Sequence, residues 1–331
     1  MDKQMKKLYK LAKREIKDAK KIAIFSHISP DVDCLASSYG LRLALIAMGK
    51  EVDMFNKEDF TLDQRLLLDE KLMNKGDVDP EKYDLFIALD TSTADRLGEY
   101  KDVFTAFPNT IKIDHHRNSA PYALINIVDS TASATCQMLY DFVKYLGVKI
   151  TPAIADMLFA GLSTDTSSFM NGITSLKSFE TATELFRLGA NVNKINEKLY
   201  YNMARSTLAI KKTFIEKMQI IDDQIAICYI SLADLKKAGA TKSDCDGFSR
   251  ELSIIEGVNM ACQITQKTKD TFNMSFRSKE GYDVNLIASI FGGGGHMCAS
   301  GAVCKAKTAE SLIDALIKEF KAYLEKRDKN A

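Results

Sequence analysis

Residues 112–117 read Lys112-Ile113-Asp114-His115-His116-Arg117, and the rest of the chain is organised around this stretch. The whole sequence has four histidines, and two of them are adjacent here. A short apolar run that begins at Thr110 leads into the motif and predicts a strand. Successive side chains on a strand point in opposite directions, so one imidazole can bind a metal while the other faces a substrate. Two solvated histidines in a loop are the alternative, and the surroundings of the other two histidines argue against it.

The composition limits the kinds of protein that the chain can be. Its 331 residues are 46% hydrophobic, which is enough for two domains with cores of their own. The formal net charge is +1, so the chain lacks the basic excess of proteins that bind long duplex nucleic acid. The charged N-terminus does not resemble a signal peptide, and no apolar run of about 18 residues predicts a membrane span. Seven cysteines without C-x-x-C spacing suit a reducing cytoplasm.

The order of the predicted elements favours an α/β fold for the first part of the chain. Apolar strands are predicted at residues 21–25, 52–55, 84–89 and 110–113. Amphipathic or capped helices are predicted at residues 3–20, 34–48, 60–73, 131–147, 152–163 and 176–189. Strands that alternate with helices in this way are typical of a parallel sheet.

The pattern changes in the last third of the chain. Strands are predicted at residues 225–230, 258–264 and 271–278, and a helix at 308–325 closes the sequence. The charged stretch 193–217 is predicted to be largely helical. We therefore expect a first domain at residues 1–192, a helical linker at 193–217 and a smaller second domain at 218–331.

Acidic and histidine side chains follow three of the four predicted strands, those at residues 21–25, 84–89 and 110–113. In open α/β sheets, ligand sites form at the carboxyl ends of the strands. A further aspartate, Asp165, follows the predicted helix at 152–163. Asp31 or Asp33 could instead cap the next helix, and Asp90 and Asp165 could be turn residues. Taken together, the candidate metal ligands are His27, Asp31, Asp33, Asp90, His115 and Asp165.

This ligand set indicates two metal ions of the hard, octahedral type. Six ligands are too many for one structural zinc ion, which is usually four-coordinate and rich in cysteine. Carboxylates with imidazoles suit Mn²⁺ or Mg²⁺ better than zinc. Two such ions about 3.5–4 Å apart can hydrolyse a phosphoester without a serine or cysteine nucleophile.

The fourth histidine follows a run of four glycines, Gly292-Gly293-Gly294-Gly295-His296. Glycines let the backbone approach a ligand closely, and their N–H groups can form a site for an anion. A flexible turn between two elements is the alternative explanation for this run.

These motifs resemble the DHH–DHHA1 phosphoesterase family over nearly the whole chain. Its short, stand-alone members, the nanoRNase/pAp-phosphatase and cyclic-dinucleotide phosphodiesterase proteins, are the most similar. The resemblance implies a parallel-sheet DHH domain that is catalytic and binds metal. It also implies a smaller, mixed-sheet α/β DHHA1 domain that binds substrate, joined by the helical linker. The matching motifs are His27-Ile28-Ser29-Pro30-Asp31-Val32-Asp33, Asp90-Thr91-Ser92, Asp114-His115-His116, Thr164-Asp165-Thr166 and Gly292–His296.

The resemblance also implies a role for each matching residue. One ion would be held by His27, Asp31 and Asp90. The second would be held by Asp33, His115 and Asp165, with Asp90 as the bridge. Both ions would be Mn²⁺, with Mg²⁺ or Co²⁺ as alternatives. The catalytic pair would be His116, which contacts the scissile phosphate, and Asp114, which orients an imidazole. The substrate clamp of the second domain would comprise Arg277, Ser278, Gly293, Gly294, Gly295 and His296.

The expected function is hydrolysis of short oligoribonucleotides, such as pApA or pGpG and chains of roughly two to five nucleotides, or of pAp. Cyclic di-AMP hydrolysis is one alternative, and a non-catalytic nucleotide-binding module is another. The sequence lacks tryptophan and a marked basic stripe, which argues against an exonuclease for long single strands. The family also implies a homodimer.

The chain departs from the family pattern next to three motifs. Cys34 stands where small residues are usual, which suggests an altered or oxidation-sensitive pocket. Arg117-Asn118-Ser119 follows the third motif, and Ser167-Ser168 replaces the more usual glycine-serine after the fourth. None of these changes removes a predicted ligand, so they affect the expected substrate preference rather than the expected activity.

Overall fold

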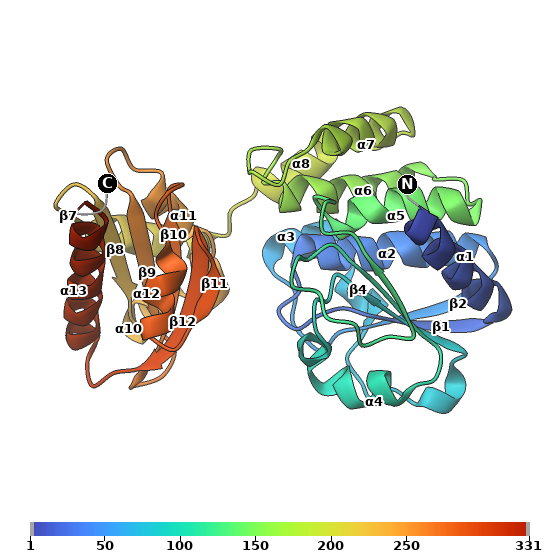
Figure 1. Cartoon of the computed structure of the whole chain (residues 1–331), viewed down its shortest axis with the longest axis horizontal. Helices are drawn as coiled ribbons and strands as arrows, with labels where there is room; N and C mark the ends of the chain where they lie inside the picture. The colour runs from blue at the N-terminus through green and yellow to red at the C-terminus, as the bar shows by residue number, and fades with distance from the viewer. Residues whose placement is uncertain (1–2, 329–331) are drawn as a thin grey trace. The chain divides into compact units, whose positions relative to one another are not determined.

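The computed structural model describes residues 3–328. They form two compact units, which are divided between Asn202 and Met203 (Figure 1). The expected helical stretch 193–217 comprises two helices, α8 (Val192–Tyr200) and α9 (Arg205–Lys217). The division between the units falls in the short segment between them. Of the described helices, none is long and apolar enough to cross a membrane.

The first unit is built on a sheet of six parallel strands in the order β3-β2-β1-β4-β5-β6. The strands are β1 (Lys21–Phe25), β2 (Glu51–Phe55), β3 (Met73–Asn74), β4 (Leu85–Leu89), β5 (Thr110–Asp114) and β6 (Ile125–Val128). Its other helices are α1 (Lys3–Asp18), α2 (Val32–Ala47), α3 (Leu62–Leu67), α4 (Lys101–Ala106), α5 (Thr135–Leu146), α6 (Pro152–Asp165) and α7 (Leu176–Arg187).

Both faces of this sheet are covered, which explains why its strands are apolar throughout. Helices α2, α5 and α6 lie over one face, and α4 lies over the other (Figure 1). Alternate side chains of β1 divide between the two layers: Ile22 and Ile24 join the large core beneath the helices. Phe25 packs on the opposite face with Phe55 and Phe86. Parallel strands buried on both faces characteristically read as continuous hydrophobic runs.

The second unit contains a mixed sheet of six strands in the order β11-β12-β10-β9-β8-β7. Strands β8 and β9 are parallel, and the other neighbours are antiparallel. The strands are β7 (Gln219–Ile221), β8 (Ile225–Ile230), β9 (Met260–Gln266), β10 (Thr271–Ser278), β11 (Gly294–His296) and β12 (Ala299–Lys305). The remaining helices are α10 (Leu232–Ala238), α11 (Phe248–Ser253), α12 (Val284–Ile290) and α13 (Ala309–Asp328).

The predicted fold class, a parallel-sheet domain followed by a mixed-sheet α/β domain, is confirmed. The predicted strands at residues 21–25, 225–230 and 271–278 coincide with β1, β8 and β10. The single helix predicted at 60–73 is wrong. Helix α3 ends at Leu67 because Leu68 has an extended backbone (φ −129°, ψ 141°), and a 3₁₀ turn at Glu70–Leu72 then leads into β3.

Candidate active site

The order of the sheet brings three of the motifs to one edge. Strands β1, β4 and β5 are adjacent, and their carboxyl ends carry His27, Asp90 and the Asp114-His115-His116 motif. Parallel strands end on the same side of a sheet, so residues from distant parts of the sequence meet there. The predicted metal ligands are therefore gathered into one cluster.

Asp90 lies at the centre of this cluster. Its side chain is 1% exposed, and its two carboxylate oxygens face different neighbours. Oδ2 lies 3.7 Å from His27 Nε2, whereas Oδ1 lies 3.5 Å from His115 Nε2. Thr135 fixes this orientation, because its hydroxyl donates to Oδ1 at 2.8 Å. The backbone of Asp90 is left-handed (φ 56°), a strained conformation that aspartate tolerates better than most residues and that is common at functional sites.

The first group of ligands surrounds His27. Its Nε2 lies 3.9 Å from Asp31 Oδ2, while the other oxygen of Asp31 accepts a hydrogen bond from the backbone of Cys34. Asp31 therefore caps α2 with one oxygen and presents the other to His27, so capping and metal binding are compatible. His27 Nδ1 lies 2.9 Å from Ile28 O, and a proton on Nδ1 leaves Nε2 free to bind a cation. The Arg96 guanidinium, a neighbour that the sequence did not reveal, is 2.8 Å from the same Nδ1. Because a guanidinium can only donate, this contact suits an unprotonated Nδ1, whereas the contact with Ile28 O suits a protonated one.

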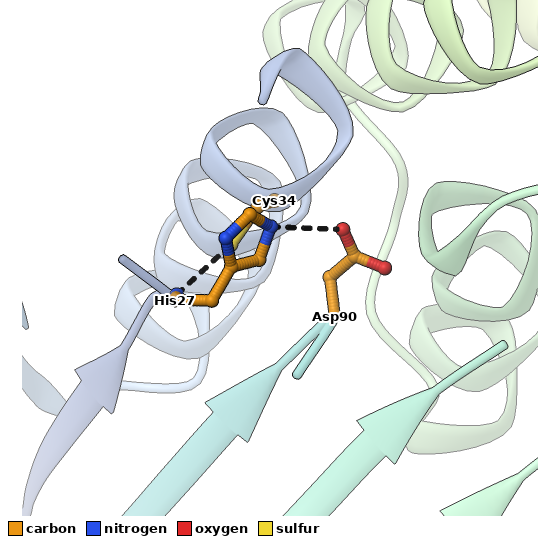
Figure 2. A group of neighbouring side chains, drawn as sticks. All are labelled: His27, Cys34 and Asp90. Carbon is orange, nitrogen blue, oxygen red and sulfur yellow. Dashed lines mark hydrogen bonds and ion pairs between the residues drawn. The ribbon is translucent and has the colours of Figure 1, made fainter. Parts of the chain in front are cut away.

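Cys34 lies behind His27 rather than at the surface (Figure 2). Its sulfur accepts a hydrogen bond from the His27 backbone N–H at 3.4 Å, and its thiol donates to Leu89 O at 3.5 Å. The residue thus ties the end of β1 to the end of β4. Burial raises the pKa of the Cys34 thiol, although the charge of His27 acts in the opposite direction. A buried, protonated thiol is poorly reactive, so the geometry does not favour the oxidation-sensitive pocket expected from the sequence.

The second group of ligands comprises His115, Asp165 and Asp33. His115 Nε2 lies 3.0 Å from Asp165 Oδ2, and Asp33 completes a set of potential ligand atoms that lie within 4.8 Å of one another. His115 Nδ1 lies 3.2 Å from Ala132 O, and a hydrogen bond donated to this oxygen leaves Nε2 free to bind a cation. Asp33 is held by the first turn of α5, where two backbone N–H groups donate to its two oxygens at 2.7 and 3.0 Å.

Gly161 makes room for Asp33. A Cβ atom at this position of α6 would lie 2.4 Å from Asp33 Oδ1 and 2.4 Å from Cys136 Sγ. Neither contact is sterically acceptable, so only glycine lets α6 pack this closely against α2 and α5. The place of Asp33 therefore depends on a residue that the sequence motifs do not include.

The electrostatics of the cluster favour a bound cation. Burial raises the pKa of Asp33 well above its ordinary value, and the negative charges of Asp90 and Asp165 raise it further. Burial alone would lower the pKa of His115, but the hydrogen bond with Asp165 and the charge of Asp33 outweigh it and raise this pKa to about 10. Crowded carboxylates thus stabilise positive charge on their neighbours. Carboxylates, correctly oriented imidazoles and excess negative charge together fit divalent cations.

His116 is arranged differently from His115. Its Nδ1 forms a 2.7 Å hydrogen bond with Asp114 Oδ1, and this bond raises the pKa of His116. The other oxygen of Asp114 accepts a hydrogen bond from the Ser119 hydroxyl. Lys112, fully buried on β5, donates to Ser119 and lies 3.8 Å from Asp114 Oδ2. Ser119 and Lys112 therefore hold Asp114 in place, and Asp114 in turn holds the Nδ1 side of the His116 imidazole. Nε2 of His116 takes part in none of these hydrogen bonds.

Two serines after the fourth motif have strained backbones. Ser167 and Ser168 have φ values of 51° and 57°, in the left-handed region that favours glycine. The sequence departs from the family pattern at these positions, where glycine-serine is more usual. The turn is nevertheless held by the Ser168 N–H, which donates to Ser163 O at 2.7 Å.

The predicted clamp residues lie on the sheet of the second unit. Arg277 on β10 and His296 on β11 both pair with Ala299 of β12, so the three residues share one face of the sheet. Two strand spacings separate Arg277 from His296, about 10 Å. The Ser278 hydroxyl donates to Tyr282 O at 2.6 Å.

The glycine run serves packing within this sheet. A Cβ on Gly293 would lie 2.1 Å from Gly301 O, and one on Gly295 would lie 2.7 Å from Ala299 O. Gly294 has a more open surrounding, with only Asn285 Oδ1 nearby at 3.7 Å. Gly293 and Gly295 are thus needed for close packing against β12.

Comparison with known proteins identifies the domains. Residues 21–162 match the model of the DHH family, N-terminal domain, and residues 222–326 match that of the DHHA1 domain. The chain belongs to the DHH–DHHA1 family. The two matched regions lie within the parallel-sheet unit and the mixed-sheet unit, respectively.

Several proteins are similar over almost their whole length. The bifunctional oligoribonuclease and PAP phosphatase NrnA of Thermus thermophilus is 27% identical over 307 residues, which cover 92% of this chain and 90% of the relative. NrnA of Bacillus subtilis is 28% identical, with 85% and 88% covered. The crystal structure of an exopolyphosphatase-related protein from Bacteroides fragilis has the same fold, with a TM-score of 0.86, 24% identity, and 97% and 96% covered.

Proposed function

We propose that this DHH–DHHA1 protein is a cytoplasmic, metal-dependent phosphodiesterase and phosphatase that hydrolyses short oligoribonucleotides and pAp. The observation that carries the proposal is the position of Asp90, whose two oxygens face two separate groups of ligands. A bridging carboxylate of this kind is what a two-metal hydrolase needs. The names of the NrnA relatives support the substrate class.

Each group of ligands would hold one Mn²⁺ ion. The first ion would be bound by His27, Asp31 and Asp90, and the second by Asp33, Asp90, His115 and Asp165. Bound divalent ions supply the acidity that generates a nucleophile from water near neutral pH and the charge that stabilises phosphate oxygens. Mg²⁺ and Co²⁺ are alternative ions for the same ligands.

The protein's own groups would handle the leaving oxygen. Asp114 holds Nδ1 of His116 and raises the pKa of this histidine, which favours the protonated imidazole. The proton on Nε2 can then pass to the leaving alkoxide as the phosphoester bond breaks. After transfer, Asp114 still fixes the ring, so His116 can be reprotonated from water without losing its orientation.

In the second unit, Arg277 and His296 would bind a substrate phosphate, with Ser278 and glycines 293–295 beside them. Arginine suits this role because its guanidinium can donate two parallel hydrogen bonds to phosphate oxygens. Assembly of the chain into a homodimer stays a prediction from the family.

Product analysis with a panel of substrates tests the proposed function. The purified chain, with Mn²⁺, would be given pAp, pApA, a five-nucleotide RNA, cyclic di-AMP and a long single-stranded DNA. We expect turnover of the first three, little on the long strand, and loss of all activity with a chelator. Selective opening of cyclic di-AMP would instead indicate second-messenger hydrolysis. Mn²⁺ binding without turnover of any member would contradict the proposal and favour a nucleotide-binding module.

A further inference from the structure

The second unit has a polar cavity next to Arg277 that the predicted clamp does not include. Its volume is about 250 Å³, and its lining includes the charged residues Arg277, Lys242 and Asp246 and the polar residues Ser249, Gln263, Thr265, Asn273 and Ser275. Of these, only Arg277 was predicted from the sequence motifs.

The register of two strands explains why this face is polar. Thr265 of β9 pairs with Asn273 of β10, and Gln263 pairs with Ser275. Directly paired side chains lie on the same face of a sheet, so these four form one continuous polar surface. The residues that alternate with them, such as Ile264 and Met274, enter the hydrophobic core on the opposite face.

This polar surface is buried without being fully satisfied. Gln263 and Thr265 are 5% and 4% exposed, and the Gln263 amide donates to the Thr265 hydroxyl at 3.1 Å. The side-chain oxygen of Asn273 is buried and has no hydrogen-bond partner among the described residues. A buried polar group without a partner costs about 1–3 kcal/mol, so such a surface is costly unless it serves binding.

The charge of the cavity favours an anion. Among the described lining residues, Asp246 supplies the one carboxylate, and Arg277 supplies a cation whose pKa is lowered by burial and by the nearby Arg250. Lys242 adds a second cation to the lining. A phosphate would complement the net positive charge of the lining and would offset the repulsion between Arg277 and Arg250.

The lining also indicates which part of a nucleotide would enter. Aromatic rings, on which nucleobases stack, are absent from the described residues that line the cavity. Hydroxyl and amide groups instead match the hydroxyls of a sugar. The 2′-hydroxyl is the group by which a protein distinguishes RNA from DNA.

We propose that this cavity binds the ribose and phosphate of a short ribonucleotide, with the phosphate at Arg277 and Lys242 and the ribose hydroxyls at Gln263, Thr265 and Asn273. The inference rests on the proposed function and deepens it, because it assigns ribose selectivity to a specific surface. Selectivity for the base is expected to be weak, since the sugar and phosphate carry the contacts.

Two variants with little change in shape test the proposal in the full chain, Thr265→Val and Gln263→Leu. Thr271→Val is the matched control, because Thr271 lies on the same face of β10 outside the cavity lining. With Mn²⁺, steady-state hydrolysis of pApA would be compared with that of its deoxyribose counterpart. Binding of pAp, its 2′-deoxy form and inorganic phosphate would be measured by calorimetry in the presence of a chelator. Thermal unfolding would confirm that each variant is folded.

We expect the wild type and the control to show a KM about tenfold lower for the ribose substrate, which is the worth of about one hydrogen bond. Both cavity variants should lose this preference while kcat is retained.

Equal KM values for ribose and deoxyribose in the wild type, or a preference kept by both variants, would overturn the inference and leave the proposed function intact. If the wild type hydrolyses neither substrate, the proposed function fails, and calorimetry decides the inference separately. Tighter binding of pAp than of its deoxy form, lost in the variants, would support it. A wild-type affinity for pAp no greater than that for inorganic phosphate would overturn the inference.

Discussion

Replacing Gly161 by alanine tests whether the fold of the first unit holds Asp33 in place. Alanine in the interior of a helix is normally favoured over glycine by roughly 0.5–1 kcal/mol. Here the new Cβ would lie 2.4 Å from both Asp33 Oδ1 and Cys136 Sγ, whereas ordinary contacts begin at 3.4 Å. Helix α6 or the carboxylate must therefore move by about 1 Å. Overpacking of this kind costs about 1–3 kcal/mol.

The net result should be destabilisation by about 1–2 kcal/mol, because the steric cost exceeds the gain in helix propensity. The displacement should also weaken Mn²⁺ binding by tenfold or more, since Asp33 belongs to the second group of ligands. Urea unfolding with a chelator measures the first effect, and calorimetric Mn²⁺ titration measures the second.

Gly40→Ala is the matched control in the neighbouring helix α2. The shortest contact of its Cβ would be with the flexible end of Leu158, at 3.2 Å, and the next, with Met157 Cβ at 3.5 Å, is an ordinary one. Stability should therefore change little, and Mn²⁺ binding should be unaffected. Wild-type stability and wild-type Mn²⁺ affinity in Gly161→Ala would refute the reasoning. Equal losses in both variants would also refute it, because the effect would then not depend on Asp33.

Three further changes test the catalytic pair and the strained turn. Lys112→Met should lower kcat for short RNA by about 10–100-fold, as loss of a supporting partner typically does. Hydrolysis of a p-nitrophenyl nucleotide ester should be spared, because its leaving group needs no proton. An equal loss of kcat on both substrates would contradict the role of Lys112 in supporting Asp114 and His116. Asp114→Asn removes the carboxylate that raises the pKa of His116. Because the imidazole then loses its proton at a lower pH, the alkaline limb of the pH–rate profile should move to lower pH. An alkaline limb that does not move would show that His116 is not the proton donor. Ser167→Gly relieves a left-handed backbone and should raise the free energy of unfolding by up to about 1 kcal/mol in urea titrations; a loss of stability would mean that the serine side chain contributes more than the strain costs.

The sequence predicted the strands of the candidate site well because their signals are local. Short apolar runs that end in aspartate or histidine identify β1, β4 and β5, and parallel strands place those ends together. Strand β3 was missed because it has only two residues, and the short turns around it carry no helical period. Strands β11 and β12 were hidden by glycines, whose packing against a neighbouring strand is invisible in a linear pattern.

The residues that support the site were harder to predict, since they act across long distances in the chain. Thr135 reaches Asp90, which is 45 positions away, and Gly161 touches Asp33 from another helix. Neither belongs to a motif. Lys112 did carry a signal, because a lysine within a buried apolar strand requires partners, but the sequence could not show that Asp114 and Ser119 supply them.

The most direct test of the account is the number of Mn²⁺ ions bound per chain, measured together with turnover in Asp90→Asn. The control is Asp95→Asn, because Asp95 follows the same strand but its side chain is 82% exposed. The wild type and the control should bind two ions and hydrolyse short RNA. Asp90→Asn should lose at least one ion and nearly all turnover, since both groups of ligands share its carboxylate. One ion in the wild type, or two ions with full turnover in Asp90→Asn, would contradict the bridging role.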